Sequence, residues 1–264
     1  MTEIKKEDIT INEFIEVIIN LDRRIIMLYQ IVIDNKWNEL SDSRSLLLKS
    51  LHEINFSTIL SLSVLAESHK LLNEQSWWLE KFNHLSEMIK KEENFADFST
   101  NRQNYLFNYL KDNYILNFYY EFEAKIRNFV RELKEVKNLD NRTKKKKQYL
   151  NGNESFYFIE LGFFIDYLGF THKDIEVLQL YSPIRNTIHN TGFFYSTTEQ
   201  NLAVKFKDRT YDFIHEEPID FIDFTFIEQL LSELVTVIEK ILKNKLITAI
   251  SEIQDPISRV TFSD

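Results

Sequence analysis

Hydrophobic side chains recur at intervals of three and four residues over most of the chain, which is the pattern of amphipathic α-helices. Near the N-terminus this spacing predicts a helix of about 25 residues. Its apolar positions are Phe14, Ile18, Leu21, Ile25, Leu28 and Val32. Asp42 or Ser43 is a suitable N-cap for a second helix. The apolar positions of that helix are Leu47, Leu51, Ile54, Leu62 and Leu65.

A third, shorter helix is predicted before a polar connection at Lys90–Asn94. Its apolar positions are Trp77, Trp78, Phe82, Leu85 and Ile89. The longest helical pattern then runs from about Asn101 to about Val136, and a polar loop from Asn138 to Gln148 follows it. We therefore place a boundary near residue 95, with an N-terminal helical layer at 1–95 packed on a core at 96–264.

The segment Phe156–Leu168 is strongly apolar and short, which predicts a buried helix that Gly169 ends. Thr171 and Asp174 resemble a capping box, and they would open a helix toward Tyr181. Pro183 then lies either at a kink or in the first turn of a new helix capped by Ser182.

The period of the pattern changes after Gly192, because apolar residues alternate at Leu202, Val204 and Phe206 and again at Tyr211 and Phe213. Alternation of this kind predicts a β-hairpin, at about 201–216. A last strong helix carries Ile227, Leu230, Leu231, Leu234, Val237, Ile238, Ile241, Leu242 and Leu246. The predicted fold class is all-α, a helical bundle with one small inserted β-hairpin.

Composition agrees with long helices and few turns. The 264 residues include only four glycines and three prolines, all at or after Gly152. The chain has no cysteine, which excludes disulfides, thiolate metal sites and cysteine nucleophiles. Charged residues interrupt every apolar run, and the N-terminus lacks a secretory signal, so we expect a cytoplasmic protein. A net charge of −9 makes non-specific binding of nucleic acid unfavourable, so any such contact needs a local basic patch.

The candidate chemistry lies in the string from Ile184 to Asn190, IRNTIHN. In a helix, Arg185 and His189 are four residues apart and project from one face. Arginine is a permanently charged, forked ligand for phosphate, and histidine exchanges a proton near neutral pH. The pair suits phosphodiester chemistry, phosphate binding, or a local polar contact.

This string, late in a helical chain and followed by a long amphipathic helix, resembles the motif of the HEPN superfamily, over roughly Asn101 to Ile253. The superfamily comprises small helical-bundle proteins that include ribonucleases, toxins and phage-defence effectors. The resemblance implies that Arg185 and His189 are active-site residues, with Asn186 as the polar neighbour, and that a homodimer completes the site. Three residues separate Arg185 from His189, where four to six are usual.

Other polar residues are supporting candidates. HEPN-like proteins often place a polar or acidic residue of the long helix near the motif, which makes Glu123 a candidate for orienting His189, although its spacing to Arg127 is also that of a solvated surface pair. We include Asn190 as a second supporting residue. A basic run in the polar loop, which is either an RNA contact or merely solvated, comprises Arg142, Lys144, Lys145, Lys146 and Lys147. Metal-binding and phosphate-loop motifs are missing from the sequence, so we expect no metal and no cofactor.

The sequence thus leaves three functional hypotheses. The first is a HEPN-like, metal-independent endoribonuclease that acts in phage defence or as a toxin with an antitoxin partner. The second is a catalytically inactive HEPN-like protein that binds RNA, a nucleotide or a protein. The third is a helical interaction scaffold without a small ligand.

Overall fold

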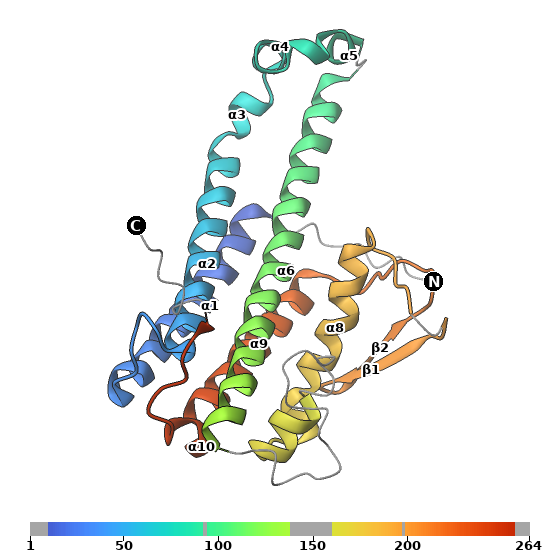
Figure 1. Cartoon of the computed structure of the whole chain (residues 1–264). Helices are drawn as coiled ribbons and strands as arrows, with labels where there is room; N and C mark the ends of the chain where they lie inside the picture. Colours follow the sequence, from blue (N-terminus) through green and yellow to red (C-terminus); the bar gives the residue numbers. More distant parts are fainter. Residues whose placement is uncertain (1–9, 92–93, 138–159, 197–198, 257–264) are drawn as a thin grey trace.

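The computed structural model describes residues 10–91, 94–137, 160–196 and 199–256. Their helices and strands confirm an all-α fold with one small hairpin (Figure 1). In chain order the elements are α1 (Ile11–Asn35), α2 (Ser43–Glu67), α3 (His69–Leu72), α4 (Gln75–Lys81), η1 (Asn83–Leu85), α5 (Ser86–Lys91), α6 (Phe95–Lys137), η3 (Glu160–Tyr167), η4 (His172–Ile175), α8 (Glu176–His189), β1 (Leu202–Phe206), β2 (Arg209–Phe213), α9 (Phe224–Lys243) and α10 (Lys245–Thr248). Among these residues, no helix is both long enough and apolar enough to cross a membrane.

The first two helices form where the sequence predicts them. Thr10 and Glu13 make a reciprocal capping box at the start of α1, and Lys36 ends the helix in the left-handed conformation. The Asp42 side chain accepts a hydrogen bond from the Arg44 N–H and so caps α2, as one of the two predicted caps. Both helices are 25 residues long.

Helix α6 is the longest element, at 43 residues, and it begins at Phe95 rather than near Asn101. The earlier start has a local cause, because the Asn94 side chain accepts a bond from the Asp97 N–H and donates to its carboxylate. With α2 beside it, the first part of α6 rises above the rest of the molecule (Figure 1). We call this projection, with α3, α4 and α5 at its tip, the arm, and the remainder the body.

The tip of the arm differs from the single short helix predicted there. The chain leaves helical geometry at Phe82, so α4, η1 and α5 follow one another as separate pieces. The break lets the Phe82 ring stack on Trp78 at 5.3 Å, and Trp78 meets Phe98 of α6 edge to face at 5.3 Å. The packing of these three aromatic rings therefore accompanies three short helical pieces in place of one continuous helix.

The body holds one continuous hydrophobic core. Buried residues of α1, α2, α6, α8, α9 and both strands belong to the same cluster. The segment before the predicted boundary near residue 95 shares this core with the segment after it. Two strands in antiparallel register, from Leu202 opposite Phe213 to Phe206 opposite Arg209, confirm the hairpin at 201–216. Val204, Phe206, Tyr211 and Phe213 point inward and carry it on the core.

A buried ionic cluster ties the C-terminal segment to the start of α2. Asp42 and Arg44 are fully buried and paired, and Asp255, also fully buried, accepts hydrogen bonds from the Lys125 ammonium at 2.8 Å and the Ser43 hydroxyl at 3.0 Å. We call Asp42, Arg44, Lys125 and Asp255 the clasp. It joins residues more than 200 positions apart in the sequence.

The segment that leads to the motif follows most of the sequence pattern. The π-helical segment η3 ends at Tyr167, two residues before Gly169, which has a φ of +74°. Thr171 and Asp174 form the predicted capping box. Pro183 lies inside α8, so the alternative of a new helix capped by Ser182 was wrong. Proline has no N–H to donate to the carbonyl of Gln179, but burial against the core keeps the helix intact across that position.

Candidate functional site

Two helices build the candidate site, α8 with the motif and α6 facing it. Tyr181 of α8 stacks on Tyr119 of α6 with ring centroids 4.4 Å apart. The Tyr181 hydroxyl donates to the carbonyl of Ile115 at 3.0 Å. Because this ring is fully buried, desolvation raises the pKa of the Tyr181 hydroxyl. These contacts lock α8 against α6 one turn before Arg185.

The guanidinium of Arg185 is held but not enclosed. Its Nη1 donates to Glu123 Oε2 at 2.8 Å, and its Nε and Nη2 make longer contacts of 3.4 and 3.3 Å to the Asn186 amide oxygen. The rings of Tyr119 and Tyr120 each lie 5.9 Å from its centre. A quarter of the side chain, 25%, is exposed. The group is thus oriented from one side and open to solvent on the other.

Glu123 is shared between two arginines. Its Oε1 accepts from Nε and Nη2 of Arg127 at 3.0 and 2.6 Å, and its Oε2 faces Arg185. Only 12% of its side chain is exposed. The three side chains together carry one net positive charge, two from arginine less one from glutamate.

His189 is the last residue of α8 and is exposed. Its Nε2 is in hydrogen-bonding contact with the hydroxyl of Tyr120, and the two rings lie 5.7 Å apart. The tyrosine donates when Nε2 is unprotonated and accepts when it is protonated. The contact fixes one ring nitrogen and leaves proton exchange open to the other.

The structure assigns the supporting contacts differently from our expectation. The carboxylate of Glu123 bonds Arg127 and Arg185, whereas the side chain that contacts His189 is Tyr120. Sequence reasoning missed Tyr120, although it lies three residues before Glu123 and hence on the same face of α6. Glu123 orients the arginine of the motif, and Tyr120 orients the histidine.

The other predicted residues fall into two groups. Asn186 joins the site through Arg185, and Asn190 ends α8 with its backbone N–H on the carbonyls of Asn186 and Thr187. The Asn190 side chain is exposed, and its supporting role stays a prediction. The basic run lies outside the described residues. It comprises Arg142, Lys144, Lys145, Lys146 and Lys147.

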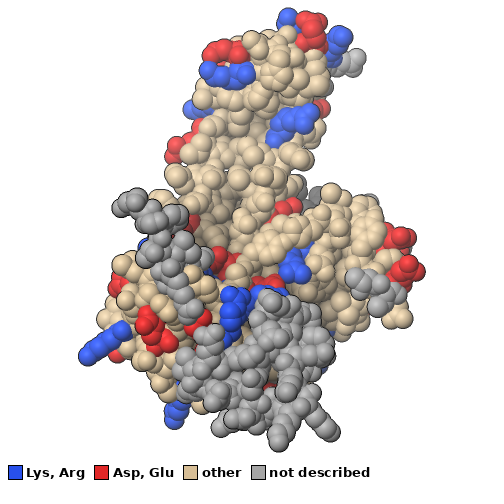
Figure 2. All heavy atoms as spheres, viewed as in Figure 1, with Lys and Arg blue, Asp and Glu red and all other residues tan. Residues whose placement is uncertain are grey.

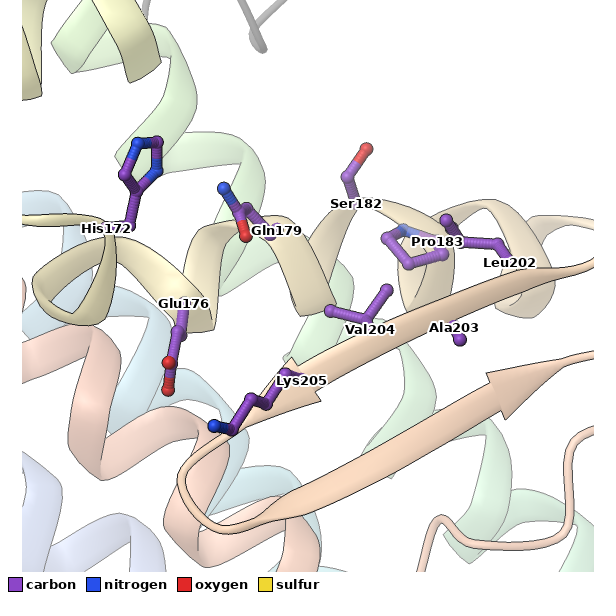
Figure 3. A pocket seen from close by; sticks show the side chains of 9 residues that line it. All are labelled: His172, Glu176, Gln179, Ser182, Pro183, Leu202, Ala203, Val204 and Lys205. Carbon is purple, nitrogen blue, oxygen red and sulfur yellow. The ribbon is translucent and has the colours of Figure 1, made fainter.

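A cavity of about 450 Å³ lies beside the site, between α8 and the edge of β1 (Figure 3). Glu176 and Lys205 stand at one end, and Ser182 and Pro183 lie farther along α8 toward the motif. Ser182 is four residues before Asn186 and shares its helix face. The cavity therefore borders the motif without containing Arg185 or His189 in its lining.

Within the described ranges, no three or more histidine, aspartate or glutamate side chains gather as a metal site would require. Comparisons with protein-family models, curated proteins and solved structures find no match to this chain. The geometry of α6 and α8 is therefore what bears on function.

Proposed function

We propose that this protein is a HEPN-like, metal-independent endoribonuclease. The observation that carries the proposal is the placement of Arg185 and His189 on successive turns of α8, both open to solvent and each oriented by a separate side chain of α6. Cleavage of a phosphodiester by general acid–base catalysis needs a group that transfers a proton and a cation that stabilises the phosphate charge. An oriented imidazole beside an oriented guanidinium meets both needs.

In the proposed reaction the imidazole of His189 removes the proton from a ribose 2′-hydroxyl. The 2′-oxygen then attacks the adjacent phosphorus, and the bond from phosphorus to the 5′-oxygen breaks as that oxygen takes up a proton from water. The products are a 2′,3′-cyclic phosphate and a free 5′-hydroxyl. Arg185 stabilises the negative charge that grows on the phosphate oxygens. Its planar guanidinium can donate two hydrogen bonds to the phosphate at once, which suits this task better than the compact ammonium of a lysine.

The biological setting follows from the resemblance of the motif. We propose that two copies of the chain associate so that both motifs contribute to one site, and that the enzyme works in the cytoplasm. Its place is in phage defence or in a toxin–antitoxin pair, where a partner protein restrains the cleavage of single-stranded RNA or tRNA. Light scattering at tens of micromolar tests the association, because a strict monomer contradicts the shared site.

The decisive experiment is cleavage of single-stranded RNA in the presence of EDTA. The native chain should release 2′,3′-cyclic phosphate ends, and His189→Ala should lose on the order of a hundredfold or more in rate. Arg185→Ala should lose as much, and Arg185→Lys should recover little of it. Matched controls are His172→Ala and Arg209→Ala, which remove an exposed histidine and an exposed arginine outside the motif.

Cleavage that survives both motif substitutions removes this pair from catalysis. A native protein that cleaves no RNA, alone or with an activator, favours a second function, a catalytically inactive HEPN-like protein that binds RNA, a nucleotide or a protein partner. One observation supports that alternative. Glu123 already occupies part of the Arg185 fork, and Tyr120 occupies one nitrogen of His189.

A further inference from the structure

The carbonyl of Gln179 lacks its usual helical donor, and Gln179 lines the cavity between α8 and β1. In an α-helix each carbonyl accepts a hydrogen bond from the N–H four residues later. For Gln179 that residue is Pro183, which lies inside α8 and has no N–H. Pro183 also lines the cavity, and its ring lies between the helix and the strand in Figure 3. The helix therefore offers the cavity a backbone acceptor.

The opposite wall of the cavity is the free edge of β1. A two-residue turn, Lys207–Asp208, joins β1 to β2, so Phe206 and Arg209 form a hydrogen-bonded pair. In an antiparallel ladder such pairs alternate with pairs that exchange no hydrogen bond. The backbone N–H and carbonyl groups of Ala203 and Lys205 therefore point away from β2.

A hydrogen bond at the turn shows which way this edge faces. The N–H of Lys207, two positions after Lys205, donates to Glu176 Oε2 of α8 at 2.9 Å. The same edge therefore faces α8 along the cavity, where the carbonyl of Ala203 and the N–H of Lys205 are neighbours. Within the described ranges, neither of these two groups has a hydrogen-bond partner. The strand offers an acceptor beside a donor, and the Gln179 carbonyl adds a second acceptor across the cavity.

Charge does not define the ligand of this cavity. Figure 2 shows basic and acidic side chains of the described residues mixed over the face that it draws. At the cavity itself, Glu176 and Lys205 bring opposite charges to one end (Figure 3). The hydrogen-bonding groups of the two walls therefore decide what fits.

The rest of the lining favours a small, partly apolar molecule. Val204 is buried, and together with Leu202 and Pro183 it gives the cavity apolar surface. A volume of about 450 Å³ is in the usual range of small-ligand sites. An added peptide strand fits less well, because Glu176 already accepts from the Lys207 N–H. That contact leaves an edge shorter than most strands.

We infer that this cavity binds a nucleobase whose Watson–Crick edge carries an amino group beside an unprotonated ring nitrogen, as in adenine and cytosine. The N–H of Lys205 donates to the ring nitrogen. The amino group donates one hydrogen to the carbonyl of Ala203 and the other to the carbonyl of Gln179. Guanine and uracil have a carbonyl oxygen in place of this amino group, which would face two carbonyls of the protein with no hydrogen between them.

The position of the cavity connects it to the motif. Ser182 lines the cavity, and it shares a helix face with Arg185 one turn farther along α8. Two sources carry such a base, a free nucleoside or nucleotide and a nucleotide of RNA. For RNA the inference rests on the proposed function, and the cavity is then the subsite for a base beside the cleaved phosphate. For a free nucleoside it stands without the proposed function.

Isothermal titration calorimetry with free nucleosides tests the cavity without any cleavage. Adenosine should bind the native chain about tenfold or more tightly than inosine, in which a carbonyl replaces the amino group and the neighbouring ring nitrogen is protonated. Cytidine should exceed uridine by a similar factor, since one mispaired base edge usually costs this much. Nucleosides carry no phosphate, so the charge of Arg185 contributes little to the comparison.

Two substitutions each remove one of the proposed hydrogen bonds. Lys205→Pro deletes the outward N–H, a change that an edge strand tolerates, and should weaken adenosine binding about tenfold. Its matched control is Lys205→Ala, which loses the same side chain but keeps the N–H and should bind adenosine as the native chain does. Circular dichroism verifies the fold of both variants.

Pro183→Ala acts on the other wall and favours the helix, so it keeps the test valid if Lys205→Pro disturbs the hairpin. The alanine returns an N–H to the carbonyl of Gln179. The ratio of adenosine to inosine affinity should therefore fall severalfold. Loss of the proline ring alone would weaken both nucleosides equally and leave the ratio unchanged, which contradicts the role of the Gln179 carbonyl and overturns the inference.

Cleavage of a dodecauridylate with one central adenosine separates the two sources. Preferred cleavage beside the adenosine that is lost in Lys205→Pro identifies RNA as the source. A native chain that binds adenosine but cleaves at all positions equally identifies a free nucleoside or nucleotide. Equal affinity for adenosine and inosine, or no binding of adenosine, overturns the inference whether or not RNA is cleaved. Adenosine binding without cleavage of any RNA is a failure of the proposed function alone.

Discussion

Two arginines in this molecule, Arg44 and Arg185, show how the same type of side chain can lie in two very different environments. Arg44 in the clasp is fully buried, and each of its five N–H groups has an acceptor, two on Asp42 and three on the carbonyls of Ile247, Ile250 and Ser251. The ring of Trp37 covers its face at 3.8 Å. Arg185 makes one short bond, to Glu123, and two long ones to its neighbour Asn186.

The difference in burial and in hydrogen bonding indicates that the two arginines have different roles. A buried guanidinium without acceptors is very unfavourable, so the complete set around Arg44 is a condition of burying it. A partly exposed guanidinium keeps water on its open side and can exchange that water for phosphate. We therefore propose that Arg44 serves stability and that Arg185 serves binding, and four substitutions can contradict or refine this division.

The largest effect is expected at Arg44. Arg44→Ala leaves the buried Asp42 carboxylate with two backbone N–H donors but without its cation, and it removes one donor from each of three carbonyls. The loss of the paired charge should lower the free energy of unfolding by about 3–5 kcal/mol. Urea denaturation measures the loss. Arg23→Ala is the control, since Arg23 is exposed and bonds Asn20 on the same helix. A loss below 1 kcal/mol at Arg44 would show that water enters the clasp.

Glu123→Gln should separate binding from turnover. The neutral amide keeps the shape but raises the net charge of the Glu123, Arg127 and Arg185 group from one to two. RNA should bind severalfold more tightly because the competing carboxylate is gone, while turnover should fall about tenfold because Arg185 loses its orientation. Separate measurement of kcat and KM checks this. Equal changes in both would contradict an orienting role.

Arg185→Ala should change stability little. The side chain is partly exposed, and its loss leaves Glu123 paired with Arg127, so the free energy of unfolding should fall by no more than about 1 kcal/mol. The same denaturation experiment as for Arg44 gives the comparison directly. If the two arginines proved equally costly to remove, the division between a structural and a binding arginine would be wrong.

The smallest effect is expected at the ion pair of Asp174 and Lys240, at the start of the segment that leads to α8. The hydrogen bond from Lys240, at 2.6 Å, lowers the pKa of Asp174 from 3.8 to about 2, with help from Thr171. A carboxyl with a lowered folded-state pKa contributes stability above its unfolded pKa. That contribution is therefore lost as the pH falls from about 4 to about 2. Solvent screening keeps it below about 1 kcal/mol.

Asp174→Asn should accordingly be less stable than the native chain at pH 6, and the gap should close as the pH falls from about 4 to 2. Thermal unfolding at a series of pH values measures the gap. Asp220→Asn, at an exposed aspartate before α9, is the control and should show no such closure. A gap that is constant over the whole range would mean that the substitution acts through helix capping alone.

Local signals in the sequence predicted most of the fold. The amphipathic period and the caps at Thr171 and Asp42 located helices correctly, because these signals depend on neighbouring residues. The alternation of apolar and polar residues predicted the β-hairpin in the same way. The break at Phe82 escaped prediction because its cause is a contact with Trp78 and, through it, with Phe98 of another helix.

The candidate site was predictable only in part, and for the same reason. The spacing of Arg185 and His189 placed them on one face, and the structure brings Glu123 to Arg185. The partner of His189 depends on how α8 lies against α6, which the stacking of Tyr181 on Tyr119 decides. No spacing within either helix alone identifies Tyr120 as that partner.

The length of α6 also has a mechanical consequence. Sharp bends in helices occur at proline, at glycine or where the ladder of hydrogen bonds is interrupted, and the 43 residues of α6 include neither proline nor glycine. Phe98 at the tip and Glu123 in the body are about 38 Å apart on this single rod. A displacement of the tip would therefore be carried along the helix axis to Tyr120 and Glu123, which would move together.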